Sequence, residues 1–307
     1  MMHARSLVRL ALLAGGLGVG AAVAHAPVAA ADSSSDWLSS FDSFLGGASV
    51  PAETASSSLD FQISIDGYDL FSTTGNTATA TSGMGDIAIA FGDGANADAT
   101  GGFGDFASAT GSNSDAVTSL YGGGYLDTAV ASGAGTYAAT GTGNLDSSFA
   151  EGANSYAITG GVVGNPADDD FAWADGANGG ANAIQGDFNT AIADGFGTAA
   201  NAESGNDNYA LALDPTGTEG SLAEAELGNG NVATVLGDNS LALAGGANDS
   251  DLGNYDVGAV LFDNNAAANT AIGADYLYDI VSAFGSESGS AAASSSGGFL
   301  SDLLSLF

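Results

Sequence analysis

The chain has 307 residues, among them 48 glycines, 36 acids and no cysteine, and its formal net charge is −34. Its only basic side chains and histidines are His3, Arg5, Arg9 and His25. A chain that loses this N-terminal segment carries −36 and has no histidine or thiol for a Ser-His-Asp or Cys-His nucleophile or a zinc site. It also has no basic side chain for nucleic-acid phosphates and no disulfide. We therefore expect no nucleic-acid partner and a protein that is not an enzyme.

Residues 1–31 are predicted to be a secretion signal. Arg5 and Arg9 lie before an apolar run from Leu7 to Val23, and three alanines precede Asp32. A charged start, an apolar centre and small residues at the cleavage site are typical of signal peptides. We expect the mature chain to be secreted or displayed at the cell surface. An uncleaved membrane anchor is the alternative for this segment.

Both ends of the mature chain are predicted to carry a short amphipathic piece. Residues 32–58 are expected to form an amphipathic helix and a Ser-rich linker, and residues 285–298 a Ser/Gly/Ala linker before the apolar segment 299–307. The apolar side chains of these two pieces include Trp37, Phe41, Phe44, Phe299, Leu303 and Phe307. They would either cap the repeat between them or anchor the chain to a lipid or a partner. Lipid contact would be purely apolar, because no basic residue is present to attract anionic lipid.

Residues 59–284 are predicted to be one repeat domain. Residues 59–84 alternate in polarity and resemble entry strands, and an A-x-A-x-G run then recurs along the chain. The first positions of these runs are separated by 19, 22, 19, 24, 19 and 19 residues: Ala88, Ala107, Ala129, Ser148, Ala172, Ala191 and Ala210. Weaker runs lie between them and end at Gly101, Gly141, Gly160 and Gly186. Each unit of about twenty residues therefore contains two strand-like runs.

This pattern predicts an all-β, elongated β-solenoid (a β-roll or β-helix) of about nine coils, because a period of two indicates strands and a longer period with turn residues indicates stacked coils. A disordered chain and a β-sandwich are the alternatives. The row opposite alanine is bulky, with Ile89, Phe171 and Leu211 among its members. Because a large apolar stripe is rarely left in water, we expect the bulky row to face the core.

The acids offer the main remaining site chemistry. Calcium prefers carboxylate and carbonyl oxygens, and the densest acidic cluster is Asp168, Asp169 and Asp170. We predict weak calcium association there and no other cofactor. A carbohydrate-active or carbohydrate-binding solenoid is the alternative, since acids are plentiful and Trp173, Tyr209 or Phe171 could stack on sugar rings.

The A-x-A-x-G runs with their G-x-N/D corners resemble the β-roll head repeats of trimeric autotransporter adhesins, although the repeat is longer and the stalk and membrane barrel are absent. The signal, the Gly/Ala/Asn/Asp bias and the apolar end resemble secreted Gly-rich proteins of the PE-PGRS kind. Either resemblance implies a surface or secreted interaction protein and supplies no functional residues.

The predicted function is an exported, non-enzymatic structural or adhesive protein of the cell envelope that presents a repetitive acidic surface. Its expected partner is an unidentified envelope or host-surface molecule, and self-association is possible. A calcium-dependent folding or binding protein is a further alternative.

Overall fold

The computed structural model describes residues 60–73, 75–214, 220–245, 254–261, 266–269, 280–284 and 290–293. All of them belong to the second of the chain's two compact units, Ser57–Phe307. This unit is an all-β solenoid of about nine coils, as the sequence predicts. The described segments contain strands and turns but no helix. The helices predicted at the two ends, with Trp37, Phe41, Phe44, Phe299, Leu303 and Phe307, lie outside the described residues.

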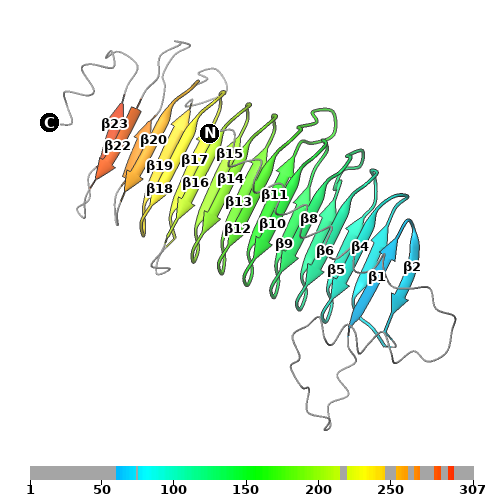
Figure 1. Ribbon diagram of the computed structural model, residues 1–307. Coiled ribbons are helices and arrows are strands. Elements are labelled where there is room, and N and C mark those ends of the chain that lie inside the picture. Colours follow the sequence, from blue (N-terminus) through cyan, green and yellow to red (C-terminus); the bar gives the residue numbers. More distant parts are fainter. Residues whose placement is uncertain are drawn as a thin grey trace, which may run out of the picture. The chain divides into compact units, whose positions relative to one another are not determined.

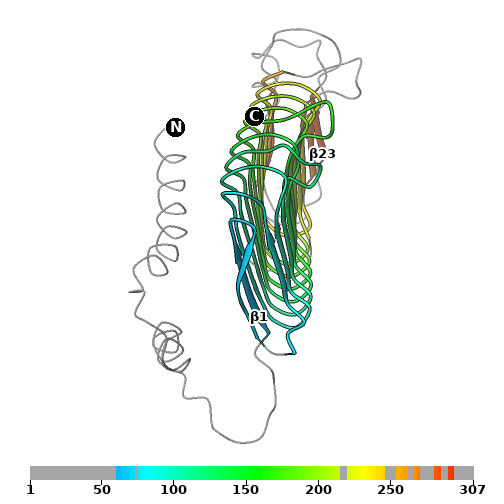
Figure 2. The same ribbon diagram turned by 90° about the vertical axis from the view of Figure 1, so that its right-hand side faces the viewer.

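Two parallel sheets form the solenoid, and they face each other across a thin core (Figures 1 and 2). Sheet A contains, in spatial order, β2 (Tyr68–Ser72), β1 (Phe61–Ile65), β4 (Ile87–Phe91), β6 (Phe106–Thr110), β8 (Thr128–Ser132), β10 (Ser147–Glu151), β12 (Phe171–Asp175), β14 (Thr190–Asp194), β16 (Tyr209–Leu213), β18 (Val232–Leu236), β20 (Val257–Leu261) and β22 (Ile280–Phe284). Sheet B contains β3 (Thr79–Ser82), β5 (Asn96–Ala99), β7 (Asp115–Thr118), β9 (Tyr137–Thr140), β11 (Tyr156–Gly160), β13 (Gly180–Ile184), β15 (Ala199–Glu203), β17 (Leu222–Glu226), β19 (Leu241–Gly245), β21 (Ala266–Asn269) and β23 (Ser290–Ala293).

Successive coils stack in register, with one strand of each coil in each sheet. In sheet A, Ala88 pairs with Ala107, which pairs with Ala129. The first two strands differ from the rest, because β1 pairs antiparallel with both β2 and β4. The predicted entry strands therefore exist, and they form a hairpin at the N-terminal edge of sheet A.

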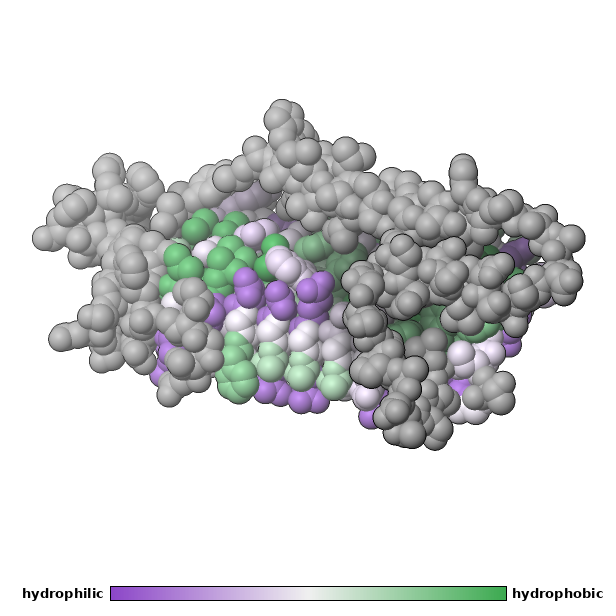
Figure 3. Space-filling view, turned by 60° about the horizontal axis from the view of Figure 1, so that its bottom comes forward, coloured by the Kyte–Doolittle hydropathy of each residue, from purple (hydrophilic) through white to green (hydrophobic). Residues whose placement is uncertain are grey.

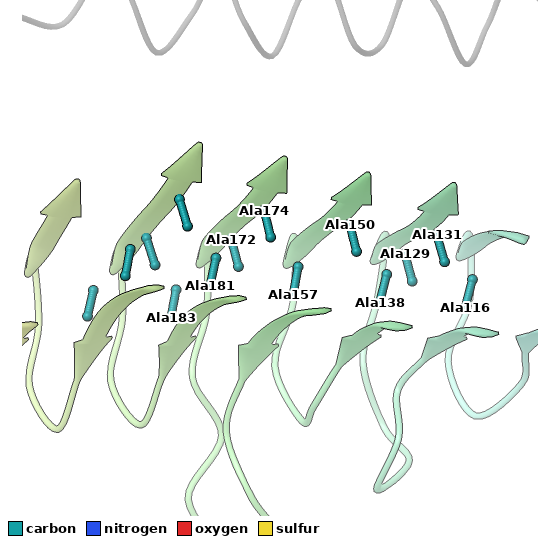
Figure 4. Close-up of a cluster of buried hydrophobic side chains, with 14 of the residues drawn as sticks. Ala116, Ala129, Ala131, Ala138, Ala150, Ala157, Ala172, Ala174, Ala181 and Ala183 are labelled. Atoms are coloured by element: carbon teal, nitrogen blue, oxygen red, sulfur yellow. The ribbon is translucent and has the colours of Figure 1, made fainter. Parts of the chain in front are cut away.

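The core of the solenoid consists almost entirely of alanine. The alanines of both sheets point toward each other between the sheets (Figure 4), and members such as Ala172 and Ala191 are fully buried. Ile89, Phe171 and Leu211 lie on the outer side of sheet A and are only half-buried. The expectation that the bulky row faces the core is therefore wrong.

The short corners explain why methyl groups suffice inside. Only four residues, Gly92–Ala95, connect β4 to β5, and such a short turn holds the two sheets close together. Large side chains on the inner rows would push the sheets apart. The bulky side chains on the outer face are instead shielded by one another, because the neighbouring strands lie only about 4.8 Å away.

Within the parallel strands β4 to β20, one polar residue replaces alanine in the inner row of sheet A. Ser148 is fully buried, and its hydroxyl donates to the backbone carbonyl of Ala139 at 2.6 Å and bonds the hydroxyl of Thr159 at 2.9 Å. Both partners belong to sheet B, so the serine links the two sheets. A buried hydroxyl with two partners costs little compared with one that has none.

The C-terminal coils extend further than the sequence predicts. Strand β22 (Ile280–Phe284) is the last strand inside the predicted repeat domain 59–284. Strand β23, at Ser290–Ala293, falls inside the segment predicted to be a linker. Its sequence S-A-A-A continues the small-residue rows of sheet B.

Candidate functional site: a buried acid column and two unlike outer faces

A column of Asp and Asn side chains runs through the corner that precedes every strand of sheet A from β4 to β20. We call it the Asx column. Its members are Asp86, Asp105, Asp127, Asp146, Asp170, Asn189, Asn208, Asn231 and Asp256. Each one is at most 1% exposed. Nine buried Asx residues at equivalent positions make this corner the most concentrated polar feature inside the solenoid.

The Asx column is held by a continuous chain of hydrogen bonds along the stack. The Oδ1 atom of each member from Asp86 to Asn231 accepts the backbone N–H of the member in the next coil, as in Asp105 N–H to Asp86 at 3.0 Å and Asp127 N–H to Asp105 at 3.0 Å. The series continues to Asp256 N–H, which donates to Asn231 at 3.1 Å. Each side chain thus satisfies a buried backbone donor at the corner of the following coil.

The second polar atom of each side chain, Oδ2 or Nδ2, has different hydrogen-bond partners along the column. In Asn189 and Asn208, Nδ2 donates to backbone carbonyls at 2.9 Å. In Asp105 and Asp127, Oδ2 accepts from the hydroxyl of Ser119 at 3.2 and 3.3 Å. The Oδ2 atoms of a third group are buried and make no hydrogen bond: Asp86, Asp146 and Asp170.

Burial changes the acidity of this column. Desolvation raises the pKa of Asp127 to about 7, that of Asp146 to about 9 and that of Asp170 to about 8. Backbone N–H donors lower these pKa values, and neighbouring carboxylates add to the increase. Desolvation likewise raises the pKa of Asp105. Burial favours the neutral form of a carboxyl group, which is the direction of the pKa shift in these four aspartates.

A glycine three residues before the Asx position makes room for its side chain. A Cβ on Gly83 would lie 2.6 Å from Oδ2 of Asp86, and one on Gly143 would lie 2.7 Å from Oδ2 of Asp146. The resulting G-x-x-D/N motif precedes most strands of sheet A, as in G-M-G-D, G-N-L-D and G-D-F-N. This motif is the signal for the column in the sequence, and our predictions from the sequence did not include it.

The opposite corner has its own motif, G-x-x-S/T. The buried hydroxyl of Ser114 donates to the carbonyl of Gly111 at 3.1 Å, and Thr198 donates to Gly195 at 3.1 Å. Each of these bonds closes within its own turn. The Oδ1 atoms therefore connect the coils at one corner, whereas hydroxyls such as those of Ser114 and Thr198 stabilise single turns at the other. The hydroxyl of Ser221 instead bonds the carbonyl of Gly237 in the next coil at 2.6 Å.

The three predicted calcium ligands have different surroundings. Asp170 belongs to the buried Asx column, and its Oδ1 accepts the N–H of Asn189 at 2.7 Å. Asp168 is half-buried and accepts two bonds from the backbone N–H and side-chain amide of Asn144 at 2.8 Å. Asp169, between them, has a left-handed backbone (φ 61°). Within the described ranges, no group of three acids, histidines or cysteines is arranged to hold a metal ion. The structure therefore assigns no metal ligands, and calcium association stays a prediction.

The outer face of sheet A carries apolar and aromatic rows. Positions one and three of its strands hold half-buried apolar side chains in most coils: Ile87, Ile89, Phe106, Val130, Phe149, Phe171, Trp173, Ile192, Tyr209, Leu211, Val232 and Val257. The rings of Phe149 and Phe171, in neighbouring strands, are 5.9 Å apart. The aromatic residues named as a stacking surface, Phe171, Trp173 and Tyr209, therefore share one face. An acid row with Glu151, Asp175 and Asp194 lies beside them.

The outer face of sheet B is more polar. Its amide side chains bond from coil to coil, as in Asn96 to Asp115 at 2.8 Å and Asn182 to Asn201 at 3.0 Å. Desolvation, followed by the charges of Glu224 and Glu203, raises the pKa of Glu226 to about 7. The space-filling view shows how residues of one kind align in rows across the coils (Figure 3). The two faces of the solenoid therefore offer different chemistry.

Comparison with known proteins gives no relative for this chain. No family model, no curated protein and no solved structure matches it. Among the described residues, no helix has the length and apolar character needed to cross a membrane.

Proposed function

We propose that this protein is an exported, non-enzymatic structural or adhesive protein of the cell envelope, and that it makes its contacts through the outer face of sheet A. The observation that carries the proposal is the alignment of apolar and aromatic side chains, coil after coil, on this one flat face. The signal-like segment 1–31 supports export. The apolar termini would serve as caps or as an anchor.

The size of the face fits such a role. Nine strands about 4.8 Å apart and five residues long give an area of about 40 by 16 Å, or roughly 600 Å². That is close to the roughly 800 Å² that each partner contributes to a stable interface and exceeds the few hundred Å² of an ordinary exposed apolar patch. The face is large enough for an envelope or host-surface partner, or for a second copy of the chain.

The placement of the acids supports a non-enzymatic role. The carboxyl groups with the most strongly raised pKa, Asp146 and Asp170, are buried inside the Asx column. A substrate outside the solenoid cannot reach them. Catalytic carboxyl groups with raised pKa must contact the substrate.

Two matched variants test the contact face. Ile192→Ser removes an apolar side chain from position three of β14 in sheet A, and Ile158→Ser makes the same change at position three of β11 in sheet B. We expect sedimentation of the mature chain with isolated envelopes of the producing cell to fall with Ile192→Ser and to persist with Ile158→Ser. Equal binding by both variants would contradict the proposed face, and retention of the chain in the cytoplasm would contradict export.

Carbohydrate binding is the second candidate. It is favoured by the arrangement of Phe149, Phe171, Trp173 and Tyr209 on one face beside carboxylates that could accept bonds from sugar hydroxyls. Trp173 offers a direct probe, because Trp37 is the only other tryptophan. In a Trp37→Phe background, a neutral polysaccharide that stacks on this face should change the fluorescence of Trp173. A reducing-sugar assay would separate binding from turnover, and turnover would overturn the non-enzymatic proposal.

A further inference from the structure

The corner that contains the Asx column carries exposed apolar side chains over its first four coils. We call this surface the apolar strip, and its members are Met84, Phe103, Tyr125, Leu126 and Leu145. They are between 48% and 75% exposed. Each one lies one or two residues before a member of the Asx column and outside the named strands of both sheets. The strip is therefore a different surface from the outer face of sheet A.

The apolar strip is continuous from coil to coil. Phe103 and Tyr125 form a parallel β-bridge, and the backbone N–H of Leu126 donates to the carbonyl of Phe103 at 3.1 Å. A Cβ at Gly85 would lie 2.5 Å from the ring of Phe103, and one at Gly104 would lie 2.7 Å from Cδ2 of Leu126. These glycines leave room for the Phe103 ring and the Leu126 side chain to lie against the preceding coil. The apolar groups are therefore held in fixed places along the corner.

Backbone strain indicates that turn chemistry does not select the two leucines. Leu126 and Leu145 have left-handed backbones, with φ of 60° and 62°. In other coils the same position holds glycine or aspartate, as in Gly104 and Asp207, and these residues adopt the conformation at lower cost. Both leucines remain about half exposed, so burial offsets little of the strain. Strain that brings the scaffold little in return points to a function at the surface.

The C-terminal coils use the same corner differently. Two residues before the Asx column they carry a second ladder of polar side chains: Asn144, Asp168, Asp187, Asn206, Asn229 and Asn254. Each Oδ1 atom after the first accepts the backbone N–H of the preceding member, as in Asp187 N–H to Asn206 at 2.7 Å. Met84, Phe103 and Tyr125 hold this position in the first three coils and have no amide or carboxyl oxygen. The first coils therefore present apolar groups where the later coils have structural hydrogen bonds.

Acidic residues border the apolar strip at both ends. Asp66 is exposed beside Gly85, whose N–H it accepts at 2.7 Å. At the other end, the N–H of Asp169 donates to the carbonyl of Asn144, the residue before Leu145, at 2.9 Å. No lysine or arginine follows residue 9. The strip is thus an apolar centre between negatively charged ends.

The size of the strip favours a short segment as its partner. Four corners about 4.8 Å apart give a length of about 14 Å, and the strip is one or two residues wide. This area is far below the roughly 800 Å² that each partner contributes to a stable interface. A second copy of the chain would also bring further acids to the acidic ends. Strands β1 and β12, which border Asp66 and Asp169, are five strand steps apart, or about 24 Å, which is the length of a helix of about 16 residues.

We propose that the apolar strip binds a short amphipathic peptide segment of another protein, with an apolar centre and basic residues toward its two ends. Apolar side chains of the segment cover Phe103, Tyr125 and the two leucines, as in other complexes in which a helix presents apolar anchors. Its lysines or arginines lie against Asp66 and Asp169, where opposite charges fix the register. Anionic lipid fits less well, because its head groups would meet the same acids. This site is independent of the contact face proposed on sheet A.

The test uses a fluorescent peptide of about 16 residues with leucine and alanine at its centre and two lysines at each end. Its binding to the purified chain is followed by fluorescence anisotropy. Leu126→Asn and Leu145→Asn remove apolar groups but suit the left-handed backbone. Each is expected to weaken binding about tenfold, as expected for one leucine left uncovered, without lowering the denaturation midpoint. The matched control is Phe188→Asn, which has the same corner position (φ 63°) beyond the strip and should leave the affinity unchanged.

A second pair of variants tests the charges. Asp66→Asn keeps the Oδ1 acceptor for the N–H of Gly85 and removes the charge, so binding should weaken about threefold at low salt and less at high salt. Asp207→Asn removes an equal charge from an exposed residue with a similar backbone (φ 59°). It lies three strand steps beyond Leu145, about 14 Å away, and screening over that distance should leave binding nearly unchanged.

Four results would overturn the proposal. The first is equal affinity of wild type and both leucine variants, and the second is equal affinity for peptides with a serine centre or with glutamate ends. The third is a dimer in sedimentation equilibrium, or binding to zwitterionic vesicles, that Leu126→Asn abolishes, because the strip would then bind a second copy or lipid. The fourth is a larger loss of stability in the leucine variants than in Phe188→Asn, which would show that the strip is part of the scaffold.

Discussion

The inner and outer rows of sheet A lie on the same strands but tolerate very different side chains. The inner row holds Ala172 and Ala191 in successive coils, and the outer row holds Phe171 and Thr190 beside them. Four-residue turns fix the space between the sheets, whereas nothing in the described coils limits side-chain size on the outer face. In this solenoid, the inner row is marked by a residue type that stays constant from coil to coil, and not by large apolar side chains.

Enlarging the inner row should have the largest effect. Ala191 is fully buried between the sheets, so Ala191→Leu has no room and is expected to destabilise the mature chain by about 3 kcal/mol, the upper part of the usual overpacking range. Chemical denaturation measures this change. The matched outer-row variant Ile192→Leu keeps the volume and should cost less than about 1 kcal/mol. Equal losses for the two variants would mean that the rows do not differ in packing.

Substitutions of corner glycines should have the next largest effect on stability, because these glycines contact the following coil. Gly152 has φ 93°, and a Cβ there would lie 2.7 Å from the carbonyl carbon and oxygen of Gly176. Gly152→Ala is expected to destabilise by about 2 to 3 kcal/mol, from backbone strain plus the clash. Gly164 has φ 87° and nothing within 4 Å of its Cβ position, so Gly164→Ala carries the strain alone and should cost about 1 kcal/mol. If Gly152→Ala and Gly164→Ala lower the free energy of unfolding equally, contact with the next coil is not the reason that position 152 requires glycine.

The sequence was enough to predict the strands, the two-strand coil and the stacking of Ala88 on Ala107, because a period of two and a period of about nineteen are both visible in it. Which row of side chains faces the core could not be predicted from hydrophobicity. That argument assumes that bulky side chains must face the core to be buried. Their neighbours on adjacent strands, however, already leave side chains such as Leu211 half-buried on the outer face.

The Asx column was harder to predict for a different reason. Asp146 and Asn208 lie outside the A-x-A register, in corners where Asp and Asn are common for their turn chemistry alone. A glycine lies three residues before most of the members that point into the stack, but Asp170 also points inward and follows Ala167. The partner of the outer face could not be predicted either, because a flat apolar surface does not specify one molecule.

A smaller effect is expected from an acid on the outer face of sheet B. Desolvation is the main cause that raises the pKa of Glu226 to about 7, so its favourable contribution is complete below about pH 4.5 and is lost as the pH rises through 7. Glu226→Gln should raise the melting temperature at pH 8 and leave it unchanged at pH 4. Solvent screening of this half-buried side chain keeps the gain below about 1 kcal/mol. A loss of stability at pH 8 would contradict this direction.

The smallest effect on stability is expected where function is proposed. Trp173 is half-buried on the outer face of sheet A beside Ile192, and Trp173→Ser leaves the inner rows and the corners untouched. This variant should lower the free energy of unfolding by only about 1 kcal/mol, because the half-buried ring of Trp173 has neighbours mostly on one side. Denaturation curves and envelope binding are to be measured on the same preparation. Loss of binding with this small change would separate the contact face from the scaffold, whereas a loss as large as that of Ala191→Leu would show that the outer row holds the coils together as well.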